Sequence, residues 1–197
     1  MSQARTSPGR PRSIQFRLGD RRPCIALAAT LGDRGREQPL ERIPDPETLA
    51  RWCLEGGFLA VSPKIAAPEL ASVRLLREAI YRAACAVRQL RKPLPEDVAT
   101  INVWAARGTL VPELTPDGRS AGWKDERALS PVLATIARDA IDMLTRTPPI
   151  RIKLCADPTC RALFVDESRP GQRRWCSMNF CGNRSKSRTF ARRHRES

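Results

Sequence analysis

Four of the seven cysteines in this chain of 197 residues lie within 27 positions of one another. Cys155 and Cys160 bracket the segment CADPTC, Cys176 and Cys181 bracket CSMNFC, and 15 residues separate the two pairs. In a reducing compartment such a cluster indicates metal binding rather than disulfides. Two closely spaced pairs suit tetrahedral zinc, and four thiolates leave no coordination position open for water. The spacing therefore predicts one structural Zn²⁺ ion bound by these four cysteines.

The residues around the cysteines predict a small zinc-binding fold. Asp157-Pro158 supplies a turn inside the first pair, and a helix is expected to begin near 177–179, with Cys181 in its first turns. Leu163–Val165 and Arg174-Trp175 are expected to form a hairpin joined at 169–171. This is a treble-clef-like or zinc-ribbon-like arrangement. Because so small a unit buries little apolar surface, we expect metal binding to supply most of its folding free energy, on the order of 10 kcal/mol.

The formal charge of +14 is concentrated at the two ends of the chain. Residues 1–22 carry six Lys/Arg and one acidic residue, and residues 151–197 carry twelve and four, whereas residues 23–150 carry seventeen and sixteen. Cations gathered in this way are typical of proteins that bind a polyanion. A solubilising tail is the alternative interpretation.

The predicted C-terminal helix carries most of the candidate contacts. At 100° per residue, one face about 80° wide holds Arg184, Arg188, Arg192 and Arg195, with Lys186 and Arg193 on the far side and Phe190 between them. Guanidinium groups can contact phosphates and base edges. Asn183 is expected either to bond a base or to cap a local turn. The predicted nucleic-acid-binding residues are Arg173, Arg174, Asn183, Arg184, Lys186, Arg188, Arg192, Arg193 and Arg195.

The pattern of the rest of the chain predicts a helical domain, so the predicted fold class is mainly α with minor β (α+β). We predict a disordered basic arm over 1–13, a multihelical domain over 14–147, and the zinc finger over 150–197, with the boundary at Pro148-Pro149. The predicted elements are a strand over 14–18, a helix or buried strand over 24–31, helices at 46–55, 67–91 and 95–107, a hairpin over 110–123, and a helix from 125 or 130 to 146.

Several function classes find no support in the sequence. There is no run of 18 apolar residues and no secretory signal, so we expect a cytoplasmic protein that does not enter a membrane. The one histidine, His194, lies in the basic tail, and no phosphate-binding glycine loop is present, so we expect no enzyme. Cys24, Cys53 and Cys85 are expected to be small buried hydrophobic residues.

The C-terminal segment LFVDESRPGQRRWCSMNFCGNRSKSRTFARR closely resembles the CGNR zinc-finger family. The resemblance covers about 155–193. In that family the finger follows an ABATE domain, described as a stress-induced transcription regulator. The segments FRLG, CIALAATL, PETLARW, LREAIYR and IARDAIDML are similar to parts of that domain. Departures are Ala26 and Ala29, where the family places Asp and Asn beside the matching Thr30, and Pro170-Gly171 in place of a more polar loop.

These observations lead to one principal hypothesis and two alternatives. The principal one is a DNA-binding transcriptional regulator, in which the finger holds DNA and the helical body senses a signal or dimerises. The alternatives are an RNA-binding zinc protein and a protein-interaction module for an acidic partner of the transcription machinery. The sequence leaves open a homodimer and a small-molecule effector. Arg77, Asn102 and Asp139 could line an effector pocket, although salt bridges at the surface explain them equally well.

Overall fold

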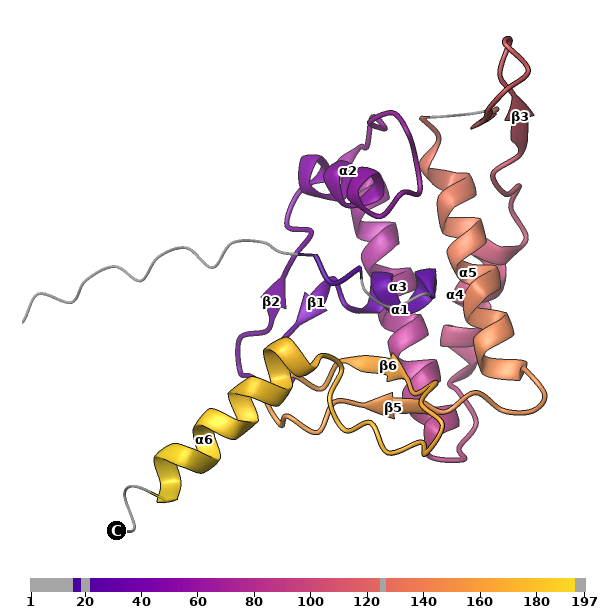
Figure 1. Cartoon of the computed structure of the whole chain (residues 1–197). Helices are drawn as coiled ribbons and strands as arrows, with labels where there is room; N and C mark the ends of the chain where they lie inside the picture. The colour runs from indigo at the N-terminus through magenta and orange to yellow at the C-terminus, as the bar shows by residue number, and fades with distance from the viewer. Residues whose placement is uncertain (1–15, 19–21, 125–126, 194–197) are drawn as a thin grey trace, which may run out of the picture.

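The computed structural model describes residues 16–18, 22–124 and 127–193 (Figure 1). Its elements confirm the predicted fold class, because helices dominate and the strands form small antiparallel pairs. In chain order they are α1 (Pro23–Ala28), β1 (Leu31–Gly32), β2 (Leu40–Glu41), α2 (Pro46–Glu55), α3 (Ala67–Arg88), α4 (Pro95–Ala105), β3 (Pro112–Leu114), β4 (Ala121–Trp123), α5 (Leu129–Thr145), β5 (Ile152–Leu154), β6 (Leu163–Val165), the π-helical turn η1 (Met178–Gly182) and α6 (Asn183–Arg193).

The helix boundaries follow from local chemistry. At the start of α2, the Asp45 carboxylate accepts a hydrogen bond of 2.7 Å from the backbone N–H of Thr48, which is one of the donors that a helix leaves unpaired at its start. Prolines in the first turn begin α2, α3 and α4 as expected. The helix α3 ends at Arg88, three residues before the predicted end. Leu90 there takes a positive φ of 57°, a conformation that terminates a helix.

The helical body is assembled around α1. Periodicity left the apolar run 24–31 undecided between helix and strand, and the structure makes it a helix followed by the short strand β1. All residues from Cys24 to Ala28 are buried, and α1 packs against both α3 and α5. The helix α4 packs against the same two helices. The predicted hairpin is formed by β3 and β4, which project from this bundle (Figure 1).

The expected strand over 14–18 is wrong where it can be tested. Residues 16–18 belong to no strand, and residues 14 and 15 lie outside the described part of the chain. The alternating pattern nevertheless has a structural meaning. Phe16 is buried in the body and Leu18 packs on the same core, whereas Arg17 between them is directed to the cysteine cluster. The two apolar side chains pack on helices rather than on a sheet, so the period-two pattern does not produce a strand.

The predicted partner of strand 163–165 is also wrong. β6 pairs with β5, with Ile152 opposite Val165 and Leu154 opposite Leu163, and residues 174–175 form no strand. The reason is burial: Ile152, Leu163 and Val165 join the hydrophobic core of the helical body, so pairing β5 with β6 covers apolar surface. The segment around Arg174 keeps one link to the first cysteine pair, because the Ala156 N–H donates to the Arg174 carbonyl (2.9 Å).

The finger is docked on the body by backbone contacts as well as by this shared core. The loop after β1 donates from the N–H of Arg34 to the Cys160 carbonyl (3.2 Å) and from the N–H of Gly35 to the Thr159 carbonyl (3.1 Å). From α3, the Tyr81 hydroxyl donates to the Arg161 carbonyl (3.0 Å). Apolar burial against the body therefore contributes to the folding of the finger. The expectation that metal binding supplies most of the folding free energy of the finger considered the finger alone, without these contacts to the body.

The polar residues noted on the apolar helices divide between interior and surface. Arg77 is only 4% exposed, and its guanidinium pairs with Glu41 (2.8 Å) and Glu78 (2.7 Å). Asp139 pairs with Arg22 (2.9 Å) and accepts a hydrogen bond from the N–H of Cys24 at the start of α1. The salt-bridge interpretation is thus confirmed for these two, although Arg77 is not at the surface. Asn102 is exposed.

The remaining cysteines mostly match their prediction. Cys24 and Cys53 are completely buried in the body, and Cys85 is half-buried. Burial raises the pKa of the Cys53 thiol to about 12, so it stays protonated at neutral pH. These thiols act as small apolar side chains.

We predict that Gly35→Ala weakens the docking of the finger. A Cβ at this position would lie 1.8 Å from the Pro158 carbonyl oxygen, a backbone atom that cannot turn aside. The free energy of unfolding in a urea titration should fall by about 1–3 kcal/mol, the usual range for overpacking. Gly108→Ala is the matched control, because a Cβ there meets nothing within 4 Å. Equal unfolding curves for the two variants would contradict the close approach.

Candidate metal centre and basic helix

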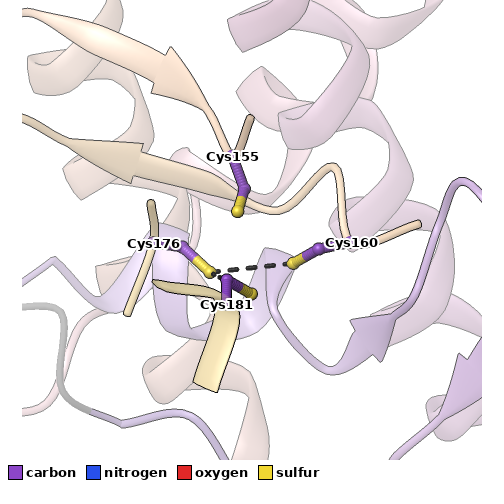
Figure 2. Close-up of side chains that lie close together, drawn as sticks. All are labelled: Cys155, Cys160, Cys176 and Cys181. Atoms are coloured by element: carbon purple, nitrogen blue, oxygen red, sulfur yellow. Dashed lines mark hydrogen bonds between the residues drawn. The ribbon is translucent and has the colours of Figure 1, made fainter. Parts of the chain in front are cut away.

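The four clustered cysteines come from three pieces of local structure (Figure 2). Cys155 directly follows β5, Cys160 closes the turn that begins at Asp157, Cys176 precedes η1, and Cys181 lies within it. Their Sγ atoms all lie within 4.8 Å of one another. The Sγ atom of Cys176 is 3.7 Å from that of Cys160 and 3.6 Å from that of Cys181. The structure therefore brings together the four predicted ligands.

This arrangement fits zinc. A tetrahedral site with Zn–S bonds of about 2.3 Å has sulfur–sulfur separations of about 3.8 Å, close to the two short separations here. Three of the four cysteines are buried and Cys176 is half-buried. Hydrogen bonds among the four thiols lower the pKa of Cys160 and raise that of Cys176, so the protons are shared unevenly within the cluster, and a bound metal ion would displace them. The four cysteines form a closed site for one structural zinc ion.

Capping interactions shape the two turns that present the thiols. The buried Asp157 carboxylate accepts hydrogen bonds from the N–H (3.0 Å) and hydroxyl (2.8 Å) of Thr159, and so fixes the turn to Cys160. Ser177 caps η1 by accepting from the N–H of Phe180 (3.4 Å). At Gly182 a Cβ would lie 3.0 Å from the terminal methyl group and 3.1 Å from the sulfur of Met178, so a side chain there would require Met178 to shift by a few tenths of an ångström.

Arginines from separate parts of the chain surround the thiols. Arg17 donates from Nη1 to the Sγ atoms of Cys176 (3.2 Å) and Cys160 (3.4 Å), and Arg184 donates to Cys181 Sγ (3.5 Å). Burial opposes the charge of Arg17, but the thiolates of Cys176 and Cys160 raise its pKa above the ordinary value. A zinc ion with four thiolates carries a net charge of −2. The two guanidinium groups therefore offset part of the charge of the filled site.

A third arginine, Arg42, lies buried beside this cluster. It is 5% exposed, its guanidinium packs against Gly32, and its Nε and Nη1 atoms have no hydrogen-bond partner among the described residues. Burial and the neighbouring Arg17 lower its pKa, while Asp33 and the thiols of Cys160 and Cys176 favour its charged form. The anionic metal centre supplies a counter-charge for this buried cation, which otherwise would be costly.

The arginine face of α6 is turned partly toward the protein itself. Arg184 Nε lies 2.7 Å from an Asp157 oxygen, and its Nη1 lies 3.6 Å from Asp33. Arg188 pairs with the same Asp157 at 3.2 Å while its side chain remains 46% exposed. Burial opposes ionisation of Asp157, but hydrogen bonds from Thr159 and the two arginines hold its pKa below the usual range. Part of the predicted phosphate-contacting face thus anchors the helix.

Two of the other candidate contacts, Arg173 and Asn183, make hydrogen bonds within the finger. Arg173 donates to the carbonyls of Trp175 (3.0 Å) and Cys176 and lies over the Phe164 ring, 4.7 Å from its centre. Asn183 donates to the Asn179 carbonyl (3.2 Å), which is a local turn contact. Arg173 and Asn183 are nevertheless exposed, as are Arg174 and Lys186. The side chains of Arg192 and Arg193, and the whole of Arg195, lie outside the described residues.

An open groove of about 630 Å³ runs beside the outward face of α6. We call it the aromatic groove, because Trp175 and Phe190 are both among its lining residues. Phe190 is 65% exposed, and the Arg174 guanidinium lies 5.2 Å from the centre of the Trp175 ring. The complete lining is Trp175, Gly182, Ser185, Lys186, Ser187, Thr189 and Phe190.

Comparison with known families agrees with this geometry. The profile of the ABATE family, described as "Putative stress-induced transcription regulator", matches residues 21–147. The chain belongs to the ABATE family. The CGNR zinc-finger profile matches residues 151–194, which include all four clustered cysteines. No match to a curated protein was found. These families are of regulator and zinc-finger type rather than enzyme families, and no helix in the described part of this ABATE protein could cross a membrane.

Three residues at the centre were missed by sequence reasoning. Arg17 and Arg42 are distant from the cysteines in sequence, as is Asp33. Arg17 lies in the ABATE-like segment FRLG, but no spacing pattern links any of the three residues to the cysteines. A signal existed only for Arg17, which interrupts the apolar pair Phe16 and Leu18 and so faces away from their core. Asp157 was recognised as a turn residue, but its ion pairs with α6 were not foreseen.

We predict that Cys160→Ser abolishes stoichiometric zinc binding. A serine hydroxyl is not a thiolate, so the closed shell loses one of its four ligands. Metal analysis of the purified protein should give about one zinc per chain for the wild type and far less for the variant. Cys85→Ala is the control, because Cys85 is outside the cluster, and it should retain the metal. Equal zinc content in both variants would contradict the assignment.

We further predict that Arg17→Met lowers zinc affinity by roughly 10- to 100-fold, the usual effect of removing a partner of a metal ligand. The methionine keeps an apolar stem but provides neither the hydrogen bonds to sulfur nor the positive charge. Competition with a coloured zinc chelator measures the affinity. Arg119→Met, an exposed change in the β3–β4 turn, should leave it unchanged. An unaltered affinity for Arg17→Met would show that the contact does not stabilise the metal.

Proposed function

We propose that this ABATE protein regulates transcription by binding DNA through its zinc finger and α6. The observation that carries the proposal is the charge of one segment. Between Glu167 and Glu196 the sequence contains nine Lys/Arg residues and no acidic residue. The helix α6 extends away from the helical body (Figure 1), so its cations can approach a large partner. An extended, acid-free cationic segment suits a polyanion.

The structure suggests how the work is divided among these cations. Arg173 and Arg184 hold the finger together through carbonyls, acids and sulfur. Arg174 and Lys186 remain exposed, and Arg188 is partly so, which makes these three the proposed phosphate or base contacts. Eleven residues give α6 a length of about 16 Å. The major groove of B-DNA, about 12 Å wide, accommodates a helix of this kind.

The helical body is proposed to position the finger rather than to contact DNA. Its residues 23–150 carry seventeen basic and sixteen acidic side chains, so they offer no net attraction for phosphates. Signal sensing or dimerisation is its proposed additional role. A cytoplasmic location is part of the proposal, since reduced thiols keep the zinc site intact. We also propose that the chain has no catalytic activity.

One observation favours a second candidate, binding of single-stranded RNA. The aromatic groove presents Trp175 and Phe190 beside Lys186, and unpaired bases stack on aromatic side chains while cations contact the backbone. Duplex DNA offers no free base faces to such a groove. The two candidates therefore predict opposite preferences between duplex and single-stranded probes.

We predict that Arg174→Gln/Lys186→Gln weakens binding to duplex DNA and makes it less dependent on salt. Each lost phosphate contact lowers the slope of log affinity against log salt by about 0.9, so the expected change is about 1.8. Fluorescence anisotropy with a labelled duplex, from 50 to 200 mM salt, measures it. Arg119→Gln/Lys124→Gln removes the same charge from exposed positions in or beside the β3–β4 hairpin and should have little effect.

Parallel titrations with single-stranded RNA and with an acidic peptide separate the alternatives. Preference for duplex DNA supports the proposal. Preference for RNA that is lost in Phe190→Ala supports the second candidate. Binding of the acidic peptide alone, with no nucleic-acid binding at any salt concentration, would contradict both.

A further inference from the structure

The helix α4 is largely apolar on its outer face as well as on its inner one. The inner face, with Ile101 and Trp104, packs against α3 and α5. The outer face is exposed and consists of Val98, Ala99, Asn102, Val103 and Ala106. A helix that is apolar all round is normally covered on every side. The single folded chain therefore leaves one side of α4 without the apolar cover that its composition requires.

The neighbouring helix α5 shows how a water-facing side of this body differs. Its exposed residues are Arg138, Asp142 and Thr145. Along α4, all of which the structure describes, no charged side chain lies on the outer face between Glu96 and Arg107. Asp97 is charged, but it is only 1% exposed because it is turned toward α3. The outer face of α4 is thus uncharged over its whole middle.

Further apolar side chains border this face. Leu94 directly precedes α4 and is exposed, and Leu75 of α3 is 66% exposed. Leu75 lies two helical turns from Arg82, so the two side chains point to the same side of α3. Because Arg82 pairs with Asp97, that side of α3 adjoins α4. Apolar side chains gathered in this way mark an interaction site. The α4 face is defined as Leu75, Leu94, Val98, Ala99, Asn102, Val103 and Ala106.

The charges at the two ends of the α4 face indicate which partner fits it. Glu96 and Arg107 are both exposed, and the Arg107 guanidinium lies 3.9 Å from the centre of the Trp104 ring. At 100° per residue the two charged positions lie within about 20° of each other around the helix, one at each end of the same flank. A second copy packed antiparallel places each Arg107 beside the Glu96 of the other chain. A parallel copy would oppose like charges.

We propose that two copies of this chain form an antiparallel, two-fold symmetric dimer through the α4 face. Asn102 lies close to the midpoint between Glu96 and Arg107, so the two Asn102 amides meet near the two-fold axis, where each can both donate and accept a hydrogen bond. An interface built chiefly from one pair of short helices is small, so the expected dissociation constant is on the order of 10 µM.

This inference specifies the dimerisation role proposed for the helical body, and it does not require that α6 bind DNA. The strands of the finger pack against α1 and α3 rather than against the outer face of α4. The helix α6 extends away from the body (Figure 1). Pairing through α4 therefore leaves α6 accessible in both copies.

Sedimentation equilibrium of the full-length, zinc-loaded protein, freed of nucleic acid, tests the dimer over about 1 to 300 µM, a range that spans the expected dissociation constant. Val103→Glu brings a charge onto the α4 face of both copies and should raise the dissociation constant at least about 10-fold. Since Val103 is 59% exposed, the variant should still fold, which thermal melting verifies. The control Leu54→Glu adds the same charge at an exposed apolar position of α2 and should leave the dimer unchanged.

A charge exchange tests the antiparallel arrangement. Glu96→Arg alone and Arg107→Glu alone each oppose like charges at both ends of a symmetric dimer, so each should weaken it roughly 10-fold. The double variant Glu96→Arg/Arg107→Glu opposes unlike charges again and should recover the wild-type dissociation constant. A loss caused only by altered folding of one chain would not be recovered in this way.

Each outcome decides the proposal. A wild type that stays monomeric at every concentration refutes the dimer, and the DNA-binding proposal is not affected. A dimer that is insensitive to Val103→Glu, or that is weakened as much by Leu54→Glu, uses another surface and overturns the proposal. A double exchange no tighter than the single variants overturns the antiparallel pairing. Selective weakening by Val103→Glu with recovery in the double variant supports it.

Discussion

Four thiols held within 4.8 Å of one another form the constraint on which the rest of this structure depends. Thiolates at such separations repel unless a metal ion lies between them, and the filled site still carries two negative charges. Arg17, Arg42 and Arg184 lie close to the thiols and offset that negative charge. They come from three distant parts of the chain. The metal centre thus connects the first described residues, the body and the C-terminal helix.

The finger and the body share a hydrophobic core and close backbone contacts, so they are more closely joined than two separate family matches suggest. The strands β5 and β6 bury Ile152, Leu163 and Val165 in the core of the helical body. The loop carrying Gly35 approaches the turn between the first two cysteines so closely that no Cβ fits. Stability therefore comes from apolar burial and metal binding together. A change in metal occupancy would act directly on the contacts between finger and body.

Asp157 determines which cations remain available for a partner. Its buried carboxylate fixes the turn to Cys160 and pairs with Arg184 and Arg188, so these arginines orient α6 against the finger. The outward side of the helix then presents Lys186 and the aromatic groove. Counting positive charges along the sequence overestimates the binding surface, because some of those charges neutralise acids and thiolates inside the protein.

The sequence by itself determined the zinc ligands, the mainly helical body and most helix boundaries, because each rests on local spacing, capping or periodicity. Examples are the two cysteine pairs, Asp45-Pro46 at the start of α2, and the apolar stripe of α3. Tertiary structure decided the partner of β6, the interior position of Arg77 and the inward turn of the Arg184 face. These features depend on contacts between segments that are far apart in the chain. Neither the periodicity nor the composition of the sequence indicates which segments make such contacts. Arg17 shows the difference most clearly: its neighbours Phe16 and Leu18 indicate a change of face, but only the folded chain places it against the thiols 143 and 159 residues away.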